Sequence, residues 1–243
     1  MTKEQIEKVY IKPTLKLGYG YYLIQLSLIE AVQDLKKKIA GRVLDLGCGV
    51  MPYRDFLIES GNIEKYIGMD LEHSEYHNKV VPDMYWDGYS IPLDDNSIDW
   101  VIVTEFLEHY YDTNAILKEM HRVLKPGGSI FFSVPFIYSL HEVPHDHHRF
   151  TPYALGKHFS DTGFSSHSIF PRGGFNYSLI IMMSLWAKQA GSKGLIRLMV
   201  KFFLFCFHKH LIRNDKKFST YKKGFTSFEN HTMPSGLWGY VTK

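Results

Sequence analysis

A histidine-rich segment, residues 141–149, holds the densest set of groups able to move a proton or bind a metal. It reads His141-Glu142-Val143-Pro144-His145-Asp146-His147-His148-Arg149. Imidazole titrates near neutral pH, so His141 or His145 could bind a substrate and remove its proton. Two other interpretations stay open: a loop in which histidines cap backbone groups and Arg149 pairs with Asp146, and a metal site of His141, His145 and Asp146. The spacing lacks a helical or hairpin register, so we predict no metal ligand.

A second set of residues could bind a nucleotide-like ligand. The turn Asp45-Leu46-Gly47-Cys48-Gly49 is followed, about 20 residues later, by Asp70 at the end of another apolar run. Glycines allow close approach of the backbone to a ligand, and a carboxylate in that place can accept ribose hydroxyls. Pro52 breaks the Gly-x-Gly-x-x-Gly pattern of nicotinamide-binding folds, and no Gly-Lys-Ser/Thr follows. Asp45 disfavours a pyrophosphate there and suits a cationic ammonium group.

Alternating strands and helices must position these groups. Hydrophobic periodicity predicts helices over 20–39, 52–58, 113–124 and 151–161, and strands over 42–46, 65–69, 80–86, 98–104, 129–134, 164–170 and 237–241. This order predicts an α/β protein with a doubly wound, Rossmann-like parallel sheet and helices on both faces. Ligands of such sheets bind beyond the carboxyl ends of the strands.

The region before the last strand, residues 171–235, is too long for an ordinary connection. It holds two apolar stretches, 177–187 and 195–207, and is predicted to be a helical insertion. Residues 1–161 carry 16 basic and 23 acidic side chains, whereas residues 162–243 carry 12 and 2, a net charge of +10. We therefore divide the chain into an N-terminal helical segment (1–40), a central domain (41–170 plus 236–243) and this basic apolar insertion.

The insertion has two competing interpretations. It is either a lid or dimerisation hairpin with buried apolar faces, or an interfacial element on an anionic membrane, with Trp186 and Phe202–Phe207 dipping into the lipid. The surface is too apolar for a nucleic-acid groove, so no nucleic-acid partner is expected. The first residues lack the apolar stretch of a signal peptide, and the two cysteines are far apart. A cytoplasmic location follows, with peripheral contact at the inner membrane face as an addition.

Four motifs in order over 41–135 carry a family resemblance. They are Val43-Leu44-Asp45-Leu46-Gly47-Cys48-Gly49, Ile91-Pro92-Leu93-Asp94-Asp95-Asn96-Ser97-Ile98-Asp99, Glu105-Phe106-Leu107-Glu108-His109 and Val123-Leu124-Lys125-Pro126-Gly127-Gly128. Together they resemble class I S-adenosylmethionine-dependent methyltransferases. The His, Pro, Asp, Arg-Phe-Thr loop also resembles methyltransferases associated with bacterial surface polysaccharides.

The resemblance implies a role for each matching position. The backbone of Gly47 and Gly49 would border the methionine part of the cofactor, and Asp45 would face its ammonium group. Asp70 would hold the ribose hydroxyls, and Asp87 the adenine amino group. The remaining members of the implied S-adenosyl-L-methionine site are Cys48, Leu71 and Gly88, with Glu105 and Phe106 near the sulfonium.

The implied activity is methyl transfer to a small molecule, a sugar or a lipid-linked glycan, with oxygen favoured as the acceptor atom. A hydroxyl acceptor must lose its proton, so His141, His145 and His109 are the candidate bases. The alternative is a non-catalytic module of the same fold that docks to a membrane or protein partner, and a homodimer is compatible with either.

Overall fold

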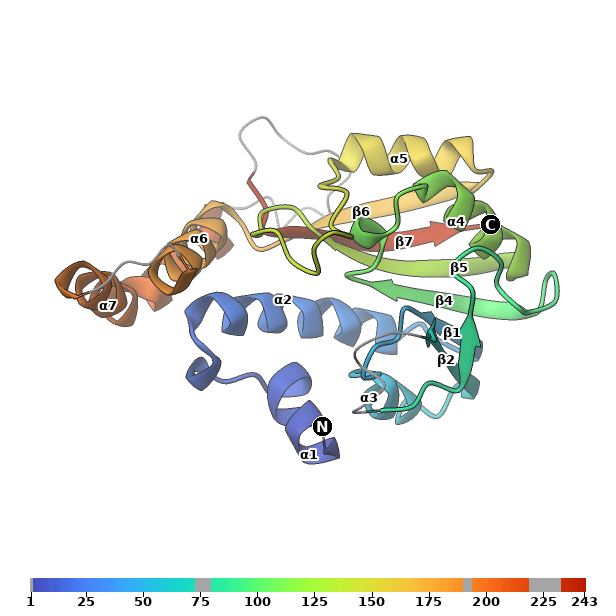
Figure 1. The fold of residues 1–243 in the computed structure, drawn as a ribbon, viewed down its shortest axis with the longest axis horizontal. Coiled ribbons are helices and arrows are strands. Elements are labelled where there is room, and N and C mark those ends of the chain that lie inside the picture. Colours follow the sequence, from blue (N-terminus) through green and yellow to red (C-terminus); the bar gives the residue numbers. More distant parts are fainter. Residues whose placement is uncertain (1, 73–79, 190–193, 219–232) are drawn as a thin grey trace.

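The computed structural model describes residues 2–72, 80–189, 194–218 and 233–243 (Figure 1). Its sheet consists of β1 (Gly41–Leu46), β2 (Ile63–Leu71), β3 (Met84–Trp86), β4 (Ile98–Thr104), β5 (Leu124–Pro135), β6 (Ser166–Arg172) and β7 (Gly236–Thr242). The order across the sheet is β3-β2-β1-β4-β5-β7-β6. The strand order reverses at β1: β2 and β3 lie on one side of it, and β4 and the later strands lie on the other. Ligands of open α/β sheets bind at such a point, beyond the carboxyl ends of the strands, here β1 and β4.

Helices cover both faces of the sheet, and the last two helices lie beyond it. They are α1 (Lys3–Ile6), η1 (Glu7–Ile11), η2 (Leu15–Leu17), α2 (Tyr19–Lys36), α3 (Arg54–Ile58), η4 (Leu107–His109), α4 (Thr113–Val123), α5 (Pro152–Asp161), α6 (Phe175–Gln189) and α7 (Leu195–Phe218). In Figure 1, α4 and α5 lie above the sheet, and α2 and α3 lie below it.

Alternate strand residues feed these two layers, as the pleat requires. Leu44 and Phe132 belong to the core under α4 and α5, whereas Val43 and Phe131 belong to the core against α2 and α3. Strands buried on both faces read as continuous apolar runs, which is why the sequence pattern located them.

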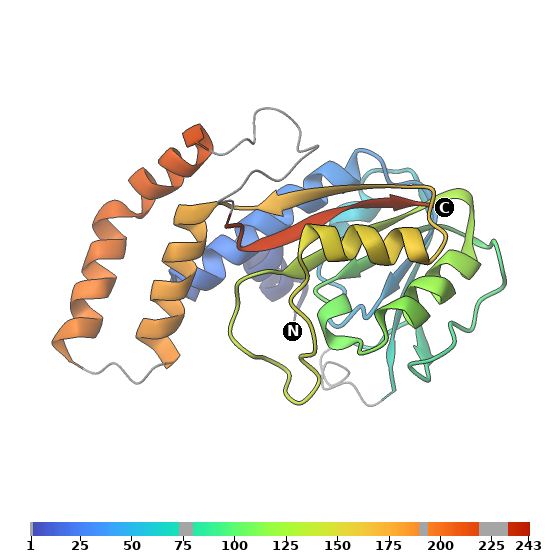
Figure 2. The same ribbon diagram turned by 90° about the horizontal axis from the view of Figure 1, so that it is seen from above.

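The sequence predicted a parallel sheet, and this prediction is wrong for one strand. β7 is antiparallel to both β5 and β6, with Gly236 opposite both Pro135 and Arg172. The reason is the insertion: the chain leaves β6 at the carboxyl edge, passes through α6 and α7, and returns at the same edge (Figure 2). β7 must therefore run back through the sheet.

Some element ends also differ from the expected ones. β3 has three residues rather than the seven expected over 80–86. Pro82 has no N–H for a ladder, and the side chain of Asp83 accepts the Gly68 N–H in place of a backbone carbonyl. β5 begins at Leu124, five residues before the expected start, because Leu124 already pairs with Ile98.

The predicted helical insertion is confirmed as the hairpin α6–α7, which projects beyond the sheet and rests on the first part of α2 (Figure 2). Leu23 of α2 packs with Ile180 and Ile181 of α6 and with Leu204 of α7. Asp215 closes the base of the hairpin, accepting the backbone N–H groups at the start of α6 from residues 176 and 177. Within the described ranges, no helix has the length and apolar character needed to cross a membrane.

Candidate active site

The turn after β1 lies at the carboxyl edge of the sheet and has little room for side chains. Gly47 and Gly49 have φ values of +69° and +50°, where a Cβ is strained. A Cβ on Gly47 would also overlap the ring of Phe106. The N–H groups of Gly47 and Cys48 both donate to the Met69 carbonyl of β2, at 2.9 and 3.1 Å. These hydrogen bonds hold the turn against β2. A turn held in this way and lacking side chains at its glycines is expected where a ligand approaches the backbone.

Asp45 is a buried carboxyl at the start of this turn. Its Oδ2 accepts a 2.6 Å hydrogen bond from the hydroxyl of Tyr66 in β2. Burial, with a smaller repulsion from Asp70, raises the pKa of Asp45 to about 7, against the lowering effect of Tyr66. Burial and the same contact with Asp45 raise the pKa of Tyr66, so the phenol stays the donor. A nearby cation would stabilise the ionised carboxylate.

Asp70 lies across the turn from Asp45. It stands at the end of β2, the second strand, as the sequence predicted. Its Oδ2 accepts the N–H of Gly49 at 3.1 Å, and its Oδ1 accepts the N–H of Leu71 at 2.8 Å. These bonds orient a largely buried carboxylate at the end of β2, while the side chain of Leu71 is exposed. The structure thereby brings together the glycine turn, Asp45 and Asp70.

Asp87 and Gly88 follow β3 and form a tight turn. Oδ1 of Asp87 accepts the N–H groups of Tyr89 and Ser90 at 2.7 and 2.9 Å, and these bonds lower the pKa of the exposed carboxyl. The carbonyl of Gly88 accepts the hydroxyl of Tyr110 at 2.6 Å.

An aromatic group stands beside that turn. The rings of Trp86 and Tyr110 stack with centroids 6.3 Å apart, and Phe106 lies within 6.5 Å of both. Phe106 also bounds the Gly47 turn, so the aromatic group connects the two halves of the predicted site. A flat heterocycle fits against such a surface.

Glu105, just after β4, adopts φ +50° and is held by two side chains. Its Oε1 accepts a 2.9 Å hydrogen bond from Ser133 and forms a 2.9 Å ion pair with Nη2 of Arg172. Arg172 is almost fully buried at the end of β6, and its Nη2 also donates to the carbonyl of Val134. The strained backbone and the ion pair together fix Glu105 at the carboxyl edge.

A cluster of Glu108, His109 and His141 lies next along the same edge. Nε2 of His109 is 3.7 Å and Nε2 of His141 is 4.0 Å from Oε1 of Glu108, and the two imidazole centroids are 4.7 Å apart. Burial raises the pKa of Glu108 well above its ordinary value, with a contribution from nearby Glu105. Burial lowers the pKa of His109, so that imidazole favours the neutral form. Two of the three predicted bases, His109 and His141, therefore lie in contact.

The third predicted base, His145, lies elsewhere in the loop, and its side chain is exposed. Its backbone carbonyl faces Nδ1 of His109 at 3.0 Å. Asp146 forms a bidentate pair with Arg149 at 2.6 and 2.7 Å, as the structural interpretation of the loop expected. The metal set of His141, His145 and Asp146 does not appear among the described clusters, where Glu108, His109 and His141 do.

Sequence reasoning missed three residues of this edge. Tyr66 and Arg172 occupy strand positions that carry no motif, although Arg172 is a lone charge at the end of an apolar strand. Glu108 lies inside the motif Glu105-Phe106-Leu107-Glu108-His109, in which the sequence assigned roles only to Glu105, Phe106 and His109. Tyr66 could have been found from the register, since it lies two residues from Gly68, the partner of Asp45.

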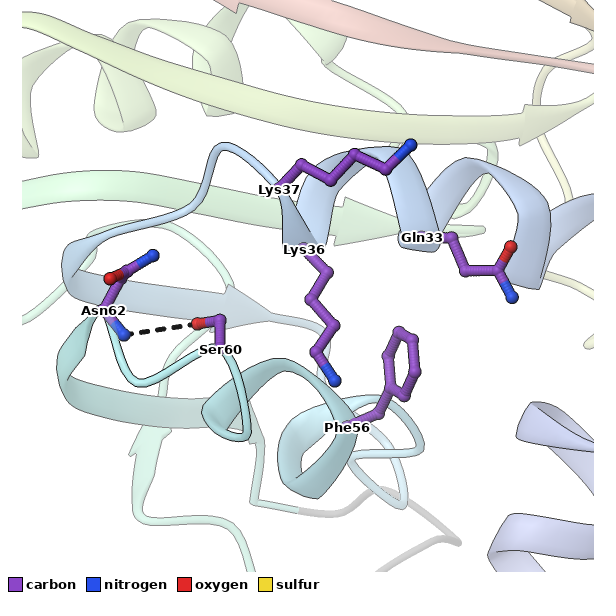
Figure 3. A pocket seen from close by; sticks show the side chains of 6 residues that line it. All are labelled: Gln33, Lys36, Lys37, Phe56, Ser60 and Asn62. Atoms are coloured by element: carbon purple, nitrogen blue, oxygen red, sulfur yellow. Dashed lines mark hydrogen bonds between the residues drawn. The ribbon is translucent and has the colours of Figure 1, made fainter.

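A surface hollow lies at the other edge of the sheet. It has a volume of about 480 Å³ and is lined by Gln33, Lys36, Lys37, Phe56, Ser60 and Asn62 (Figure 3). Lys36 lies over the ring of Phe56 and pairs with Glu59, which satisfies its charge. The hollow borders the amino end of β2, opposite the edge at which open α/β sheets bind ligands. We therefore do not assign it to the site.

Comparison with known proteins agrees with this geometry. Residues 44–132 match the family model described as "Methyltransferase domain". A demethylmenaquinone methyltransferase of Staphylococcus saprophyticus is 31% identical over 110 residues, which cover 42% of this chain and 47% of the relative. One from Staphylococcus epidermidis is 30% identical over 144 residues, covering 53% and 59%. The chain thus spans about half the length of these curated relatives.

Solved structures share the fold at low identity. A SAM-dependent methyltransferase from Archaeoglobus fulgidus has a TM-score of 0.55 at 17% identity, with full coverage of both chains. Phosphoethanolamine N-methyltransferase 2 of Haemonchus contortus, in complex with S-adenosyl-L-methionine, has a TM-score of 0.53 at 14% identity, covering 100% of this chain and 60% of that one. Residues 44–132 of the chain are therefore similar to a methyltransferase domain, and the sheet has the fold of these solved methyltransferase structures.

Proposed function

We propose that the protein transfers a methyl group from S-adenosylmethionine to an oxygen of a small molecule, a sugar or a lipid-linked glycan. The observation that carries the proposal is the arrangement of Asp45, Asp70 and the Gly47–Gly49 turn at the carboxyl edge of a methyltransferase-type sheet. The relatives named as demethylmenaquinone methyltransferases support a small-molecule acceptor.

The residues at this edge fit the cofactor. The ring of Phe106 packs directly on Gly47, where a Cβ would overlap it, so glycine is required for this turn to lie against Phe106. Asp45 is a buried carboxyl whose ionisation an ammonium group would favour. Asp70 suits a ribose, and the aromatic group beside Asp87 suits an adenine. Each assignment follows the role that the family resemblance implied.

The sulfonium of the cofactor supplies a methyl group that is already activated, so the protein mainly aligns the acceptor and assists loss of its proton. Glu105, fixed by Arg172, precedes η4, and η4 carries Glu108 and His109. We place the acceptor oxygen against the cluster of Glu108, His109 and His141. The imidazoles of His109 and His141, or that of exposed His145, are the groups available to accept the proton.

Alanine variants of the three histidines test the catalytic part of the proposal. Loss of a general base lowers turnover about 100- to 10,000-fold while cofactor affinity is retained. His147→Gln is the matched control, because His147 is an exposed histidine of the same loop outside the cluster. Turnover is followed as release of S-adenosylhomocysteine with soluble sugars, small hydroxylated molecules and lipid-linked glycans as acceptors. Cofactor binding without turnover on any of them would favour the non-catalytic module.

The hairpin α6–α7 supports a membrane-facing acceptor. Phe202 and Phe205 of α7 are 66% and 69% exposed, and α6 presents Met182 and Trp186. Only Leu204, His208 and Asp215 are buried along the described part of α7. An exposed apolar surface of this extent marks an interaction site. It adjoins the carboxyl edge, because α6 starts three residues after Arg172 ends β6.

The charge of the same hairpin favours an anionic membrane over a second copy of the chain. Arg197, Lys201, Lys209 and Arg213 are exposed on α7, while Asp215, the one acid of the described hairpin, is engaged in capping α6. A homodimer through this surface would bring like charges together. An anionic bilayer offsets them, at about 1 kcal/mol for each basic side chain near the surface. Lys193, Lys222 and Lys223 are further basic residues of the region 171–235 and lie outside the described residues.

Vesicle co-sedimentation tests this contact. We expect binding to vesicles containing phosphatidylserine, weaker binding as salt rises and little binding to pure phosphatidylcholine. Lys201→Glu should weaken binding by at least about fivefold, the equivalent of about 1 kcal/mol. Phe202→Ala should weaken it through lost apolar contact. A protein that stays in the supernatant at low salt, or sediments as a dimer that conceals these side chains, would contradict the membrane proposal.

A further inference from the structure

Three donor atoms converge at the carboxyl edge of the sheet. Oε1 of Glu108 and Nε2 of His109 come from η4, whereas Nε2 of His141 comes from the loop between β5 and α5. Side-chain donor atoms of these three residues all lie within 4.8 Å of one another. Segments more than 30 residues apart in the sequence thus converge on one point.

Neighbouring acceptors fix the tautomer of both imidazoles. Nδ1 of His109 faces the carbonyl of His145 at 3.0 Å. Nδ1 of His141 faces Oδ2 of Asp146 at 3.3 Å, and Asp146 is itself held by Arg149. In the neutral form of either ring, an Nδ1 that faces an oxygen acceptor carries the proton, and the lone pair then lies on Nε2. This is the arrangement by which second-shell oxygens orient metal-binding histidines.

The carboxylate of Glu108 is the unsatisfied member of the cluster. Its side chain is 0% exposed, and neither oxygen has a hydrogen-bond partner among the described residues. The 3.7 and 4.0 Å separations from the imidazoles are too long for hydrogen bonds. Burying a carboxylate unpaired costs several kcal/mol, so either a proton or a cation must neutralise it. Two imidazole lone pairs aimed at the same place favour a cation with affinity for nitrogen.

We propose that Glu108, His109 and His141 bind a divalent first-row transition ion, with Zn²⁺ as the representative. Two imidazole nitrogens and one carboxylate oxygen form a donor set that holds such ions while leaving a position open. Metal–ligand bonds of about 2.0–2.2 Å in a tetrahedral site place neighbouring donors about 3.3–3.6 Å apart, so small side-chain movements inward complete the site. Glu142, whose Oε2 is 3.8 Å from Nε2 of His109, stands on the more exposed side as an additional oxygen donor.

The role of the ion rests on the proposed methyl transfer. An acceptor hydroxyl at the open position would have its pKa lowered, and its proton would pass to solvent water. The acceptor oxygen then forms a bond to the methyl carbon, while the electron pair of the breaking carbon–sulfur bond stays on sulfur. His109 and His141 would thus serve as ligands, leaving no imidazole of the cluster to act as the base.

Metal binding is measured without cofactor or acceptor, so its outcome is separate from that of the methyl-transfer proposal. The full chain is stripped with chelator, and Zn²⁺ alone is titrated by competition with a chromophoric chelator. We expect one equivalent in the wild type and an increase in Kd of at least about 100-fold in Glu108→Gln and in His141→Asn, given that second-shell changes alone cost 10–100-fold. His147→Gln is the matched control and should bind as the wild type does.

Glu108→Gln also separates loss of the site from loss of the fold. The substitution replaces a buried carboxyl that has no hydrogen-bond partner among the described residues with little change in shape, so the metal-free variant should unfold at the wild-type temperature or above it. Zn²⁺ should raise the Tm of the wild type and leave that of the variant unchanged. No stoichiometric Zn²⁺ in the wild type, or equal affinity in Glu108→Gln, would overturn the proposal and indicate that a proton neutralises Glu108.

Discussion

Tyr66 donates a 2.6 Å hydrogen bond to Asp45, and the two buried side chains link β1 to β2 at the point where the glycine turn begins. The phenol gives the carboxyl one neutral partner, which is too little to keep its pKa in the usual range against burial. Asp45 is thereby prepared to ionise when a cation arrives. This property gives the proposed cofactor site a signature that can be measured.

Affinity for S-adenosylmethionine should depend on pH through Asp45. An ammonium group favours the ionised carboxylate, whereas the free protein holds its proton up to a pKa of about 7. Below that pH the Kd should rise, by at most about tenfold for each pH unit, and binding should release a proton. Calorimetry in two buffers of different ionisation enthalpy measures both effects. Asp45→Asn should bind more weakly and lose this dependence; an unchanged pH profile in that variant would remove Asp45 from the site.

The free energy of unfolding of the cofactor-free protein should fall as the pH rises, whereas the affinity for the cofactor should increase. The folded pKa of Asp45 is raised above the unfolded value near 3.8, so protonation favours the folded state. The contribution is fully present below about pH 4 and is lost as the pH rises through about 7. Urea unfolding of wild type and Asp45→Asn across this range isolates the contribution. The difference between the two proteins should vary over that window, and a constant difference would contradict the raised pKa.

Removal of Arg172 should destabilise the carboxyl edge. Arg172→Met breaks the ion pair with Glu105 and the hydrogen bond to the carbonyl of Val134. We expect a loss of about 3 kcal/mol in the free energy of unfolding. This is the lower end of the range for removing one partner of a buried ion pair, and we choose it because Glu105 is partly exposed. Denaturant titration checks the value. A loss below about 0.5 kcal/mol, the size of an ordinary surface substitution, would show that the pair does not hold β6 to Glu105.

The base of the hairpin should depend on Asp215. Asp215→Ala leaves two backbone N–H groups at the start of α6 without their acceptor and should cost about 1–2 kcal/mol. Hydrogen exchange should quicken in α6 and α7 more than in the sheet. Asp161→Ala is the matched control, since Asp161 is half-exposed and pairs only with Lys157 among the described contacts. Equal protection of the hairpin in both variants would contradict the capping role.

The layers of the fold were predictable because β1, β4 and β5 are buried on both faces and read as continuous apolar runs. The direction of β7 was not, since an apolar strand has the same pattern whichever way it runs. Asp45 and Asp70 were located by their distance from the glycine turn, which is fixed by chain geometry. Arg172 and Glu108 act through partners distant in the sequence, and their pairing with Glu105 and His141 arises only from tertiary contact.

Binding of S-adenosylmethionine by Asp70 and the Gly47–Gly49 turn, as proposed above, can be tested by titration with the cofactor. Cofactor affinity is measured for the wild type, for Asp70→Ala and for Asp94→Ala, an exposed acid at the other end of the sheet. Asp70→Ala leaves the ribose hydroxyls without a charged acceptor and should cost about 1.5–3 kcal/mol, or about 10- to 150-fold in Kd. Asp94→Ala should match the wild type. No binding by the wild type at millimolar cofactor, or equal affinity in Asp70→Ala, would contradict the account.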